Sequence, residues 1–259
     1  MTMSDTYDTP DTRDMLDRTR QGVIGKPLDR PEGPLKVAGT AAYAAEYARE
    51  GCAEGVLVGA TISTGRIRKI HREAVMAMPG VLGVFSSERM LRRAAQGTAG
   101  EAPEQDVSKV DFPMQPVALV VAETFEQATA AAKALRIDYD DASGEARFVA
   151  TEDSAQPADD PVEAGDLDRA LREAAHAVDL RLTTAGHASA AMEPHAAVAE
   201  WQGGELTLWG SVQMLGYNVA ELADSLGIAK DKVRILAPYV GGGFGSKLGI
   251  SHEAVAAAL

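Results

Sequence analysis

The chain has 259 residues, of which 46% are hydrophobic and 24% charged, and this globular composition allows one large domain or two ordinary ones. Its formal net charge of −13 argues against nucleic-acid binding, because phosphate contacts require clustered Lys and Arg and no basic stripe occurs. The single cysteine, Cys52, excludes an internal disulfide and an iron–sulfur cluster held by four cysteines of this chain. Electrons from any redox chemistry must therefore leave through another polypeptide.

Residues 1–30 are predicted to form a polar tail. The first 24 are rich in aspartate and have too little apolar surface to order themselves. They lack the apolar run of a signal peptide, and the chain has no stretch of about 20 apolar residues for a membrane span. We expect a soluble cytoplasmic protein, with the periplasm accessible through a partner's export signal.

The first half of the chain shows strand patterns mixed with few helical ones. Continuous apolar runs of strand length occupy residues 56–62, 81–85 and 117–122. Thr124 and Gln127 have the spacing of a capping box and open a helix that continues to Leu135. Residues 137–140 then alternate as a short strand. This order predicts an α+β domain of mixed strands and few helices.

An acidic segment between residues 140 and 161 predicts an exposed connection and the domain boundary. The second domain, residues 146–259, is expected to begin with a helix capped by Asp166 and to continue with a half-buried strand over residues 178–183. The pair Gly203-Gly204 indicates a two-residue hairpin between residues 196–201 and 205–209.

Helical spacing follows from Met214 to Leu226, with Gly227 at the stop position. Residues 233–236 form a strand that leads into a glycine-rich loop, and Ser251 can cap the last helix. Leu259 ends that helix without a Gly, Pro or basic stop signal, so we expect the C-terminus to be cut rather than finished.

The glycine-rich loop, residues 240–247 (VGGGFGSK), is the most informative segment. Its glycines allow positive φ and close approach to a ligand, and between a strand and a helix the loop would direct N–H groups and a helix dipole at an oxo or phosphate oxygen. A flexible turn is the simpler alternative. Ser246 separates Gly245 from Lys247, which disfavours a Walker A loop, and it stands where a dinucleotide fingerprint needs its last glycine.

Several motifs in one order resemble the molybdopterin-binding large subunit of the xanthine dehydrogenase and aldehyde oxidase family, in particular its bacterial aldehyde oxidoreductase branch. The similar segments are residues 30–43 (RPEGPLKVAGTAAY), 78–81 (MPGV), 115–122 (QPVALVVA), 186–195 (GHASAAMEPH), 206–213 (LTLWGSVQ) and the glycine-rich loop. The resemblance runs from about residue 25 to the last residue. It implies an α/β hammerhead domain over residues 31–145, followed by the first, truncated part of the molybdopterin-binding domain over residues 146–259.

The resemblance implies cofactor contacts at Gln213, Gly242, Gly243, Phe244 and Gly245, where the glutamine amide and the loop backbone meet an oxo group of molybdenum. A neutral amide can donate to an oxo ligand without transferring a proton, and glycine permits backbone approach. For Gln213 alone, a polar residue at a helix start that bonds nearby backbone is an equal alternative.

Residues His187, Glu193 and His195 could suggest a metal site, but their spacing matches no ligand pattern, and the family holds its metal through dithiolene sulfurs. We therefore predict no metal ligand and interpret these groups as satisfied buried polar residues. Lys247 is expected to be a solvated residue at a helix start. Trp201 and Trp209 are expected in the core.

Where relatives that oxidise xanthine carry a substrate-binding carboxylate after the loop, this chain has Leu248. An apolar side chain cannot hydrogen-bond the polar edge of a purine. Leu248 therefore favours an aldehyde or a less polar heterocycle as substrate, unless it packs under the helix.

The family's activity is hydroxylation of aldehydes or N-heterocycles with water as the oxygen source. The resemblance implies a molybdopterin cofactor in the cytosine dinucleotide form, with 2Fe-2S and FAD on partner chains. It places the general-base glutamate beyond residue 259, so no catalytic residue is assigned here and the chain alone is expected to be inactive. The alternative is a non-catalytic assembly or scaffold protein that retains the fold.

Overall fold

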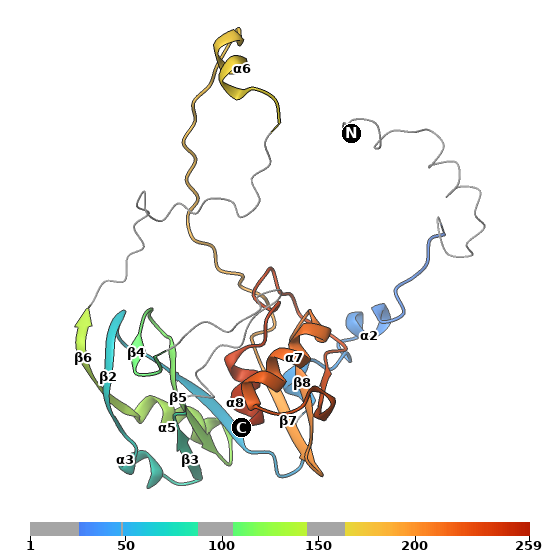
Figure 1. Cartoon of the computed structure of the whole chain (residues 1–259). Coiled ribbons are helices and arrows are strands. Elements are labelled where there is room, and N and C mark those ends of the chain that lie inside the picture. Colours follow the sequence, from blue (N-terminus) through green and yellow to red (C-terminus); the bar gives the residue numbers. More distant parts are fainter. Residues whose placement is uncertain (1–25, 48, 88–105, 144–163) are drawn as a thin grey trace. The chain divides into compact units, whose positions relative to one another are not determined.

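The computed structural model describes residues 26–47, 49–87, 106–143 and 164–259 (Figure 1). It divides into two units, residues 1–41 and 42–259. In the first unit the described helix is α2 (Gly33–Val37), with a proline in its first turn. Most of the predicted tail and of the acidic connection lies outside the described residues. The mixture of helices and three small sheets confirms the predicted α+β class.

The first sheet has the antiparallel order β1 (Glu54–Gly59), β5 (Pro116–Ala122) and β3 (Val81–Phe85). All three strands were predicted from their apolar runs. The central strand β5 is buried almost throughout, because neighbours cover it on both edges and α5 (Phe125–Ala134) packs against it. The capping box of α5 is confirmed, since Thr124 Oγ1 accepts from Gln127 N at 3.3 Å and Gln127 Oε1 accepts from Thr124 N at 3.1 Å.

The second sheet has the order β4 (Lys109–Val110), β2 (Thr64–His71) and β6 (Arg136–Ser143). The strand predicted over residues 137–140 is real but longer, and β2 was not predicted at all. Charged side chains of β2 pair with β6, as in Arg68 Nη2 to Asp138 Oδ2 at 3.5 Å. Cross-strand charge pairs contribute to this strand, whose sequence has no apolar run from which it could be predicted. The short helix α3 (Glu73–Met76) follows β2.

The third sheet joins β7 (Ala197–Gln202), β8 (Glu205–Gly210) and β9 (Val233–Leu236). β7 and β8 form the predicted hairpin, with φ of +57° at Gly203 and +82° at Gly204, as a two-residue turn of the I′ kind requires. β9 pairs parallel to β8, which requires a crossover connection.

That crossover is α7 (Leu215–Leu226), followed by the 3-10 helix η3 (Lys230–Lys232). As predicted, α7 ends at Gly227, which adopts the left-handed conformation. The last helix, α8 (His252–Ala258), begins at the predicted cap, with Ser251 Oγ accepting from Ala254 N at 3.3 Å.

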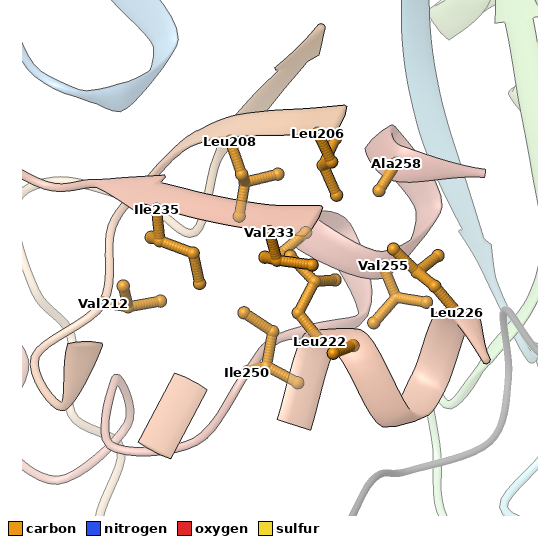
Figure 2. Close-up of a cluster of buried hydrophobic side chains, with 12 residues drawn as sticks. Leu206, Leu208, Val212, Leu222, Leu226, Val233, Ile235, Ile250, Val255 and Ala258 are labelled. Carbon is orange, nitrogen blue, oxygen red and sulfur yellow. The ribbon is translucent and has the colours of Figure 1, made fainter. Parts of the chain in front are cut away.

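The core of the C-terminal half lies between the third sheet and helices α7 and α8 (Figure 2). Its apolar side chains come from β8, β9, both helices and the loops beside them, so burial ties the crossover to the sheet. The labelled members are Leu206, Leu208, Val212, Leu222, Leu226, Val233, Ile235, Ile250, Val255 and Ala258.

The prediction of a half-buried strand over residues 178–183 is wrong. This segment has no regular structure, and Leu182 is 86% exposed. Helix α6 (Leu167–Glu173) forms with its predicted cap, Asp166 Oδ1 accepting from Arg169 N at 2.9 Å, but it buries no residue. Alternation predicts a strand only where a neighbour supplies hydrogen bonds and cover, and within the described residues none pairs here.

The two tryptophans differ. Trp209 is 6% exposed and lies in the core as predicted, but Trp201 is 44% exposed, and its indole N–H donates to Ala258 O at 2.8 Å. The prediction of a buried Trp201 is therefore wrong, because β7 is an edge strand and its end is only partly covered.

Candidate functional site

The glycine-rich loop is held by segments from three places in the chain. Glu193 N donates to Gly241 O at 3.2 Å and Gln213 N donates to Lys247 O at 2.9 Å, so both ends of the loop are bonded to neighbouring backbone. Near its middle, Ser189 Oγ donates to Phe244 O at 3.2 Å. These contacts argue against the flexible-turn alternative, since the loop is fixed at its ends and at its tip.

Close approach explains the glycines at two loop positions. A Cβ at Gly241 would collide with the Glu193 side chain and lie 3.3 Å from its backbone N. A Cβ at Gly243 would overlap the Gln213 amide, with its Cδ only 2.6 Å away. Neither glycine has positive φ. At Gly241 the Glu193 Cβ and backbone exclude a side chain, whereas at Gly243 the obstacle is the end of the Gln213 side chain. The structure thus brings Gln213 and Gly243 together.

The tip of the loop has unusual backbone geometry at Phe244. Its φ is +48°, a left-handed value uncommon for a residue with a side chain, and Gly245 follows with φ +94°. The ring is 77% exposed. A non-glycine residue at positive φ costs free energy and persists only where its surroundings hold it, so the loop fixes Phe244 in a strained conformation.

The Gln213 side chain is exposed at the end of the connection from β8 to α7. It does not cap α7; Asn218 Oδ1 instead accepts from the backbone N of Met214, the residue just before that helix, at 3.1 Å. Among the described residues the Gln213 amide has no hydrogen-bond partner. The alternative role for Gln213 as a helix-start residue is therefore not supported, and its amide is available to a ligand beside Gly243.

Lys247 is not solvated, and the prediction that it would be is wrong. The residue is 1% exposed, and Nζ donates to the Glu193 backbone O at 2.8 Å and to Glu193 Oε2 at 3.1 Å. A buried ammonium requires such a partner because desolvation penalises an unpaired charge. The partner lies 54 positions earlier in the chain, so local pattern could not reveal it.

Glu193 connects this lysine to the surrounding segments. Its Oε2 accepts from Ser211 Oγ and from Gly241 N, both at 2.6 Å, and its Oε1 accepts from Ala44 N at 3.3 Å. Ala44 begins the 3-10 helix η1 (Ala44–Tyr47). Burial raises the pKa of Glu193, but the hydrogen bonds from Ser211, Gly241, Lys247 and Ala44 outweigh burial and lower that pKa below its ordinary value. Glu193 is thus an ionised, satisfied buried carboxylate, as predicted.

The two histidines do not join Glu193. His187 is exposed, so its prediction as a buried polar residue is wrong, and His195 is half-buried. The described part of the chain contains no group of three His, Cys, Asp or Glu side chains arranged to hold a metal ion. Leu248 is 46% exposed directly after the buried Lys247. Helix α8 starts only at His252, so a helix dipole does not point into the loop, and the donors available there are the loop's own amides.

Comparison with known proteins finds two family models that match successive parts of the chain. Residues 38–143 match the family described as aldehyde oxidase and xanthine dehydrogenase, a/b hammerhead domain, and residues 150–259 match the molybdopterin cofactor-binding domain. The aldehyde oxidoreductase molybdenum-binding subunit PaoC of Escherichia coli is 39% identical over 98% of this chain. The chain belongs to the aldehyde oxidase and xanthine dehydrogenase family.

Other relatives of the family are more distant. The carbon monoxide dehydrogenase large chain of Hydrogenophaga pseudoflava is 30% identical over 75% of this chain and 28% of its own length. Quinoline 2-oxidoreductase from Pseudomonas putida 86 shares the fold, with a TM-score of 0.74 and 23% identity over 91% of this chain and 33% of that chain. The chain spans only 35% of the Escherichia coli subunit. No helix among the described residues is long and apolar enough to cross a membrane.

Proposed function

We propose that this chain forms the N-terminal part of a molybdenum-dependent subunit that hydroxylates aldehydes, with Gln213 and the backbone of residues 242–245 in contact with molybdopterin. The observation that carries the proposal is the unpartnered Gln213 amide held against Gly243. The residues fit such a group: the missing Cβ at Gly243 leaves room for the amide, and the left-handed tip turns the Phe244-Gly245 backbone.

Bound molybdopterin would supply oxygen transfer and two-electron chemistry. The contribution of this chain is to bind and orient. Gln213 would donate a neutral N–H from beside Gly243, and Phe244 and Gly245 would present their backbone at the next two positions of the loop. Donors fixed in advance stabilise developing charge without reorganisation during the reaction. Glu193 bonds Gly241 at the start of the loop and Lys247 at its end, so the Glu193–Lys247 pair holds both ends of the loop.

Leu248 supports an aldehyde as substrate. Its apolar, 46% exposed side chain follows the loop and offers no hydrogen bond to a purine. The names of relatives agree with this choice, since one acts as an aldehyde oxidoreductase. An N-heterocycle is the second candidate, and it is favoured by the fold shared with quinoline 2-oxidoreductase.

The rest of the assembly follows from the family. The subunit takes the cytosine dinucleotide form of molybdopterin and passes electrons to partners that carry 2Fe-2S and FAD, in keeping with its single cysteine. The general-base glutamate lies outside these residues, so the isolated chain does not turn over aldehydes. We assign the hammerhead domain to residues 31–145, the start of the molybdopterin-binding domain to residues 146–259, and the assembly to the cytoplasm or, through a partner's export signal, the periplasm.

Molybdenum and pterin analysis of the full-length subunit, purified with its partner chains, tests this function. We expect molybdenum, a cytosine-containing pterin and dye-linked oxidation of benzaldehyde. A protein without molybdenum or pterin would support the scaffold alternative instead.

Substrate choice is tested separately in the same preparation. Because each unmade charged hydrogen bond costs about 1.5 to 3 kcal/mol, xanthine should trail benzaldehyde in kcat/KM by at least about tenfold, and Leu248→Glu should narrow that gap. Faster oxidation of xanthine than of benzaldehyde by the wild type would reverse the substrate assignment and leave the cofactor assignment intact.

A further inference from the structure

Helix α7 carries two buried polar side chains that the proposed cofactor site does not use. Asn218 is 0% exposed and Glu221 is 5% exposed. They are three positions apart and therefore share one face of the helix. A buried amide and a buried carboxylate are costly unless hydrogen-bonded, so their contacts show what they hold in place.

Both side chains bond the backbone that follows Lys247. Asn218 Nδ2 donates to Leu248 O at 2.8 Å and to Glu221 Oε2 at 2.9 Å. Glu221 Oε2 also accepts from Ile250 N at 2.7 Å. The two polar side chains thus hold the backbone on either side of Gly249.

The same segment is fixed by its other groups. Lys247 is anchored through its buried ammonium and through its carbonyl, which accepts from Gln213 N. Ile250 is 5% exposed and belongs to the core between the third sheet and the helices. Between these anchors the Leu248 side chain is 46% exposed. A backbone fixed on both sides of a half-exposed side chain is the arrangement of a contact residue, and it argues against Leu248 as packing under a helix.

We propose that Asn218 and Glu221 are positioning residues that set substrate selectivity. Asn218 holds the Leu248 carbonyl, Glu221 holds Asn218 and the Ile250 amide, and together they place the Leu248 side chain against the substrate. This inference rests on the proposed function. Neither residue touches the reacting atoms; each acts through Leu248.

Three variants of the full-length, assembled enzyme test the proposal. Asn218→Asp keeps the acceptor for Met214 N but loses the donors to Leu248 and Glu221. Glu221→Gln keeps an acceptor for Ile250 N and is the conservative variant. Asp224→Asn makes the same carboxylate-to-amide change at an exposed position of α7 and is the control. The measurements are molybdenum content, kcat and KM for benzaldehyde and acetaldehyde, and hydrogen exchange of the backbone amides of residues 248–250.

We expect Asn218→Asp to speed exchange at Ile250 N and to lower the benzaldehyde-to-acetaldehyde ratio of kcat/KM by about tenfold or more, mainly through KM, because small displacements of a positioning group have such effects. Molybdenum content should stay at the wild-type level. Glu221→Gln should fall between Asn218→Asp and the control, and the control should match the wild type.

An unchanged ratio in both Asn218→Asp and Glu221→Gln would overturn the proposal, and so would an equal fall for both aldehydes in proportion to lost molybdenum, which indicates a purely structural role. If Asn218→Asp does not assemble, Glu221→Gln decides alone. A wild type without molybdenum or aldehyde oxidation would instead overturn the proposed function and this inference with it, and that result is known before any variant is made.

Discussion

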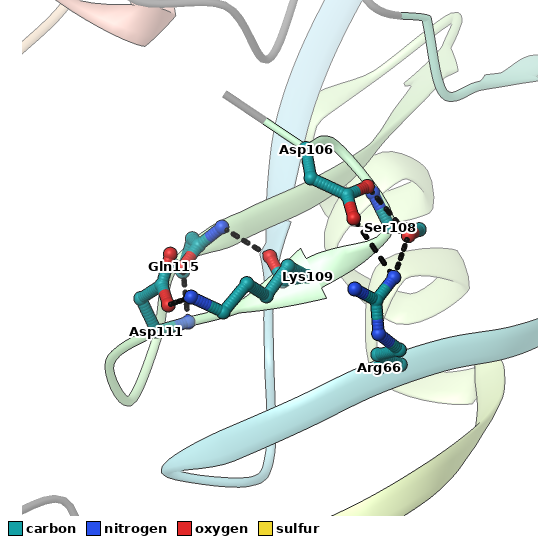
Figure 3. Close-up of polar contacts among 6 residues, drawn as sticks. All are labelled: Arg66, Asp106, Ser108, Lys109, Asp111 and Gln115. Carbon is teal, nitrogen blue, oxygen red and sulfur yellow. Dashed lines mark hydrogen bonds and ion pairs between the residues drawn. The ribbon is translucent and has the colours of Figure 1, made fainter. Parts of the chain in front are cut away.

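Two regions of the molecule use the same polar chemistry at different depths. In the C-terminal half, Lys247 pairs with Glu193, and Ser211 donates to the carboxylate. In the N-terminal half, Arg66 pairs with Asp106 at 2.8 Å, and Ser108 donates to that carboxylate at 2.6 Å (Figure 3). The buried pair has side chains 0% and 11% exposed, and the surface pair 54% and 46%.

The difference in burial decides what each cluster does. At the surface, water competes for both charges, so the Arg66–Asp106 pair adds little stability and holds only an edge of the second sheet. In the Lys247–Glu193 pair, water cannot reach the charges unless the structure opens. Removing one partner therefore leaves the other as an unpaired buried charge. The same kind of ion pair therefore gives a dispensable contact in one place and a structural support for the candidate site in the other.

The largest expected effect is that of Lys247→Met. Removal of the ammonium leaves the Glu193 carboxylate buried without its cation, which should lower the free energy of unfolding by about 3 to 5 kcal/mol. Urea unfolding of the chain measures this effect. The matched control is Lys232→Met, whose exposed ion pair with Glu205 spans 3.3 Å. Equal stability losses in the two variants would contradict the comparison.

Acid unfolding tests whether ionisation of the buried Glu193 carboxylate is linked to stability. The hydrogen bonds to Glu193 lower its pKa despite burial, so its contribution to stability is present above the unfolded value and is lost as the pH falls through the lower, folded pKa. We expect wild-type stability to decline from about pH 4.5 downwards and Glu193→Gln to remove part of that decline. A pH profile of unfolding that is parallel in wild type and Glu193→Gln would show that the carboxylate is not linked to folding.

The smallest effect is expected at the surface cluster. Hydrogen bonds from Ser108 and Arg66 also lower the pKa of Asp106, but this carboxylate is exposed. Arg66→Ala should change the free energy of unfolding by about 0 to 1 kcal/mol, and added salt should reduce even that difference. A loss comparable to that of Lys247→Met would mean that burial does not separate the two clusters.

The difference between local signals and contacts with distant partners explains what the sequence could predict. Signals within a few residues were reliable: the capping box at Thr124, the hairpin at Gly203-Gly204 and the stop at Gly227 were all confirmed. Features that depend on distant partners were missed or wrong. Strand β2 relies on charges from β6, and the burial of Lys247 relies on Glu193, which no local pattern connects to it.

For the candidate site, the sequence placed Gln213 and the glycine-rich loop together through the resemblance, and the contact between Gln213 and Gly243 confirms their proximity. It did not reveal the polar groups beneath them. Glu193 was interpreted as a satisfied group without its partner, and Asn218 and Glu221 carried no signal, because polar residues in a helix are usually exposed.

The most direct test of the central claim compares Gly243→Ala with Gly216→Ala in the full-length, assembled enzyme. A Cβ at Gly243 would displace the Gln213 amide without backbone strain, whereas one at Gly216, in α7, meets nothing within 4 Å. We predict that Gly243→Ala keeps wild-type stability but loses about 10²- to 10³-fold in kcat for benzaldehyde, as for the loss of one preorganised donor, while Gly216→Ala stays at the wild-type rate. Wild-type turnover by Gly243→Ala would contradict the claim that Gln213 and the glycine-rich loop form the cofactor site.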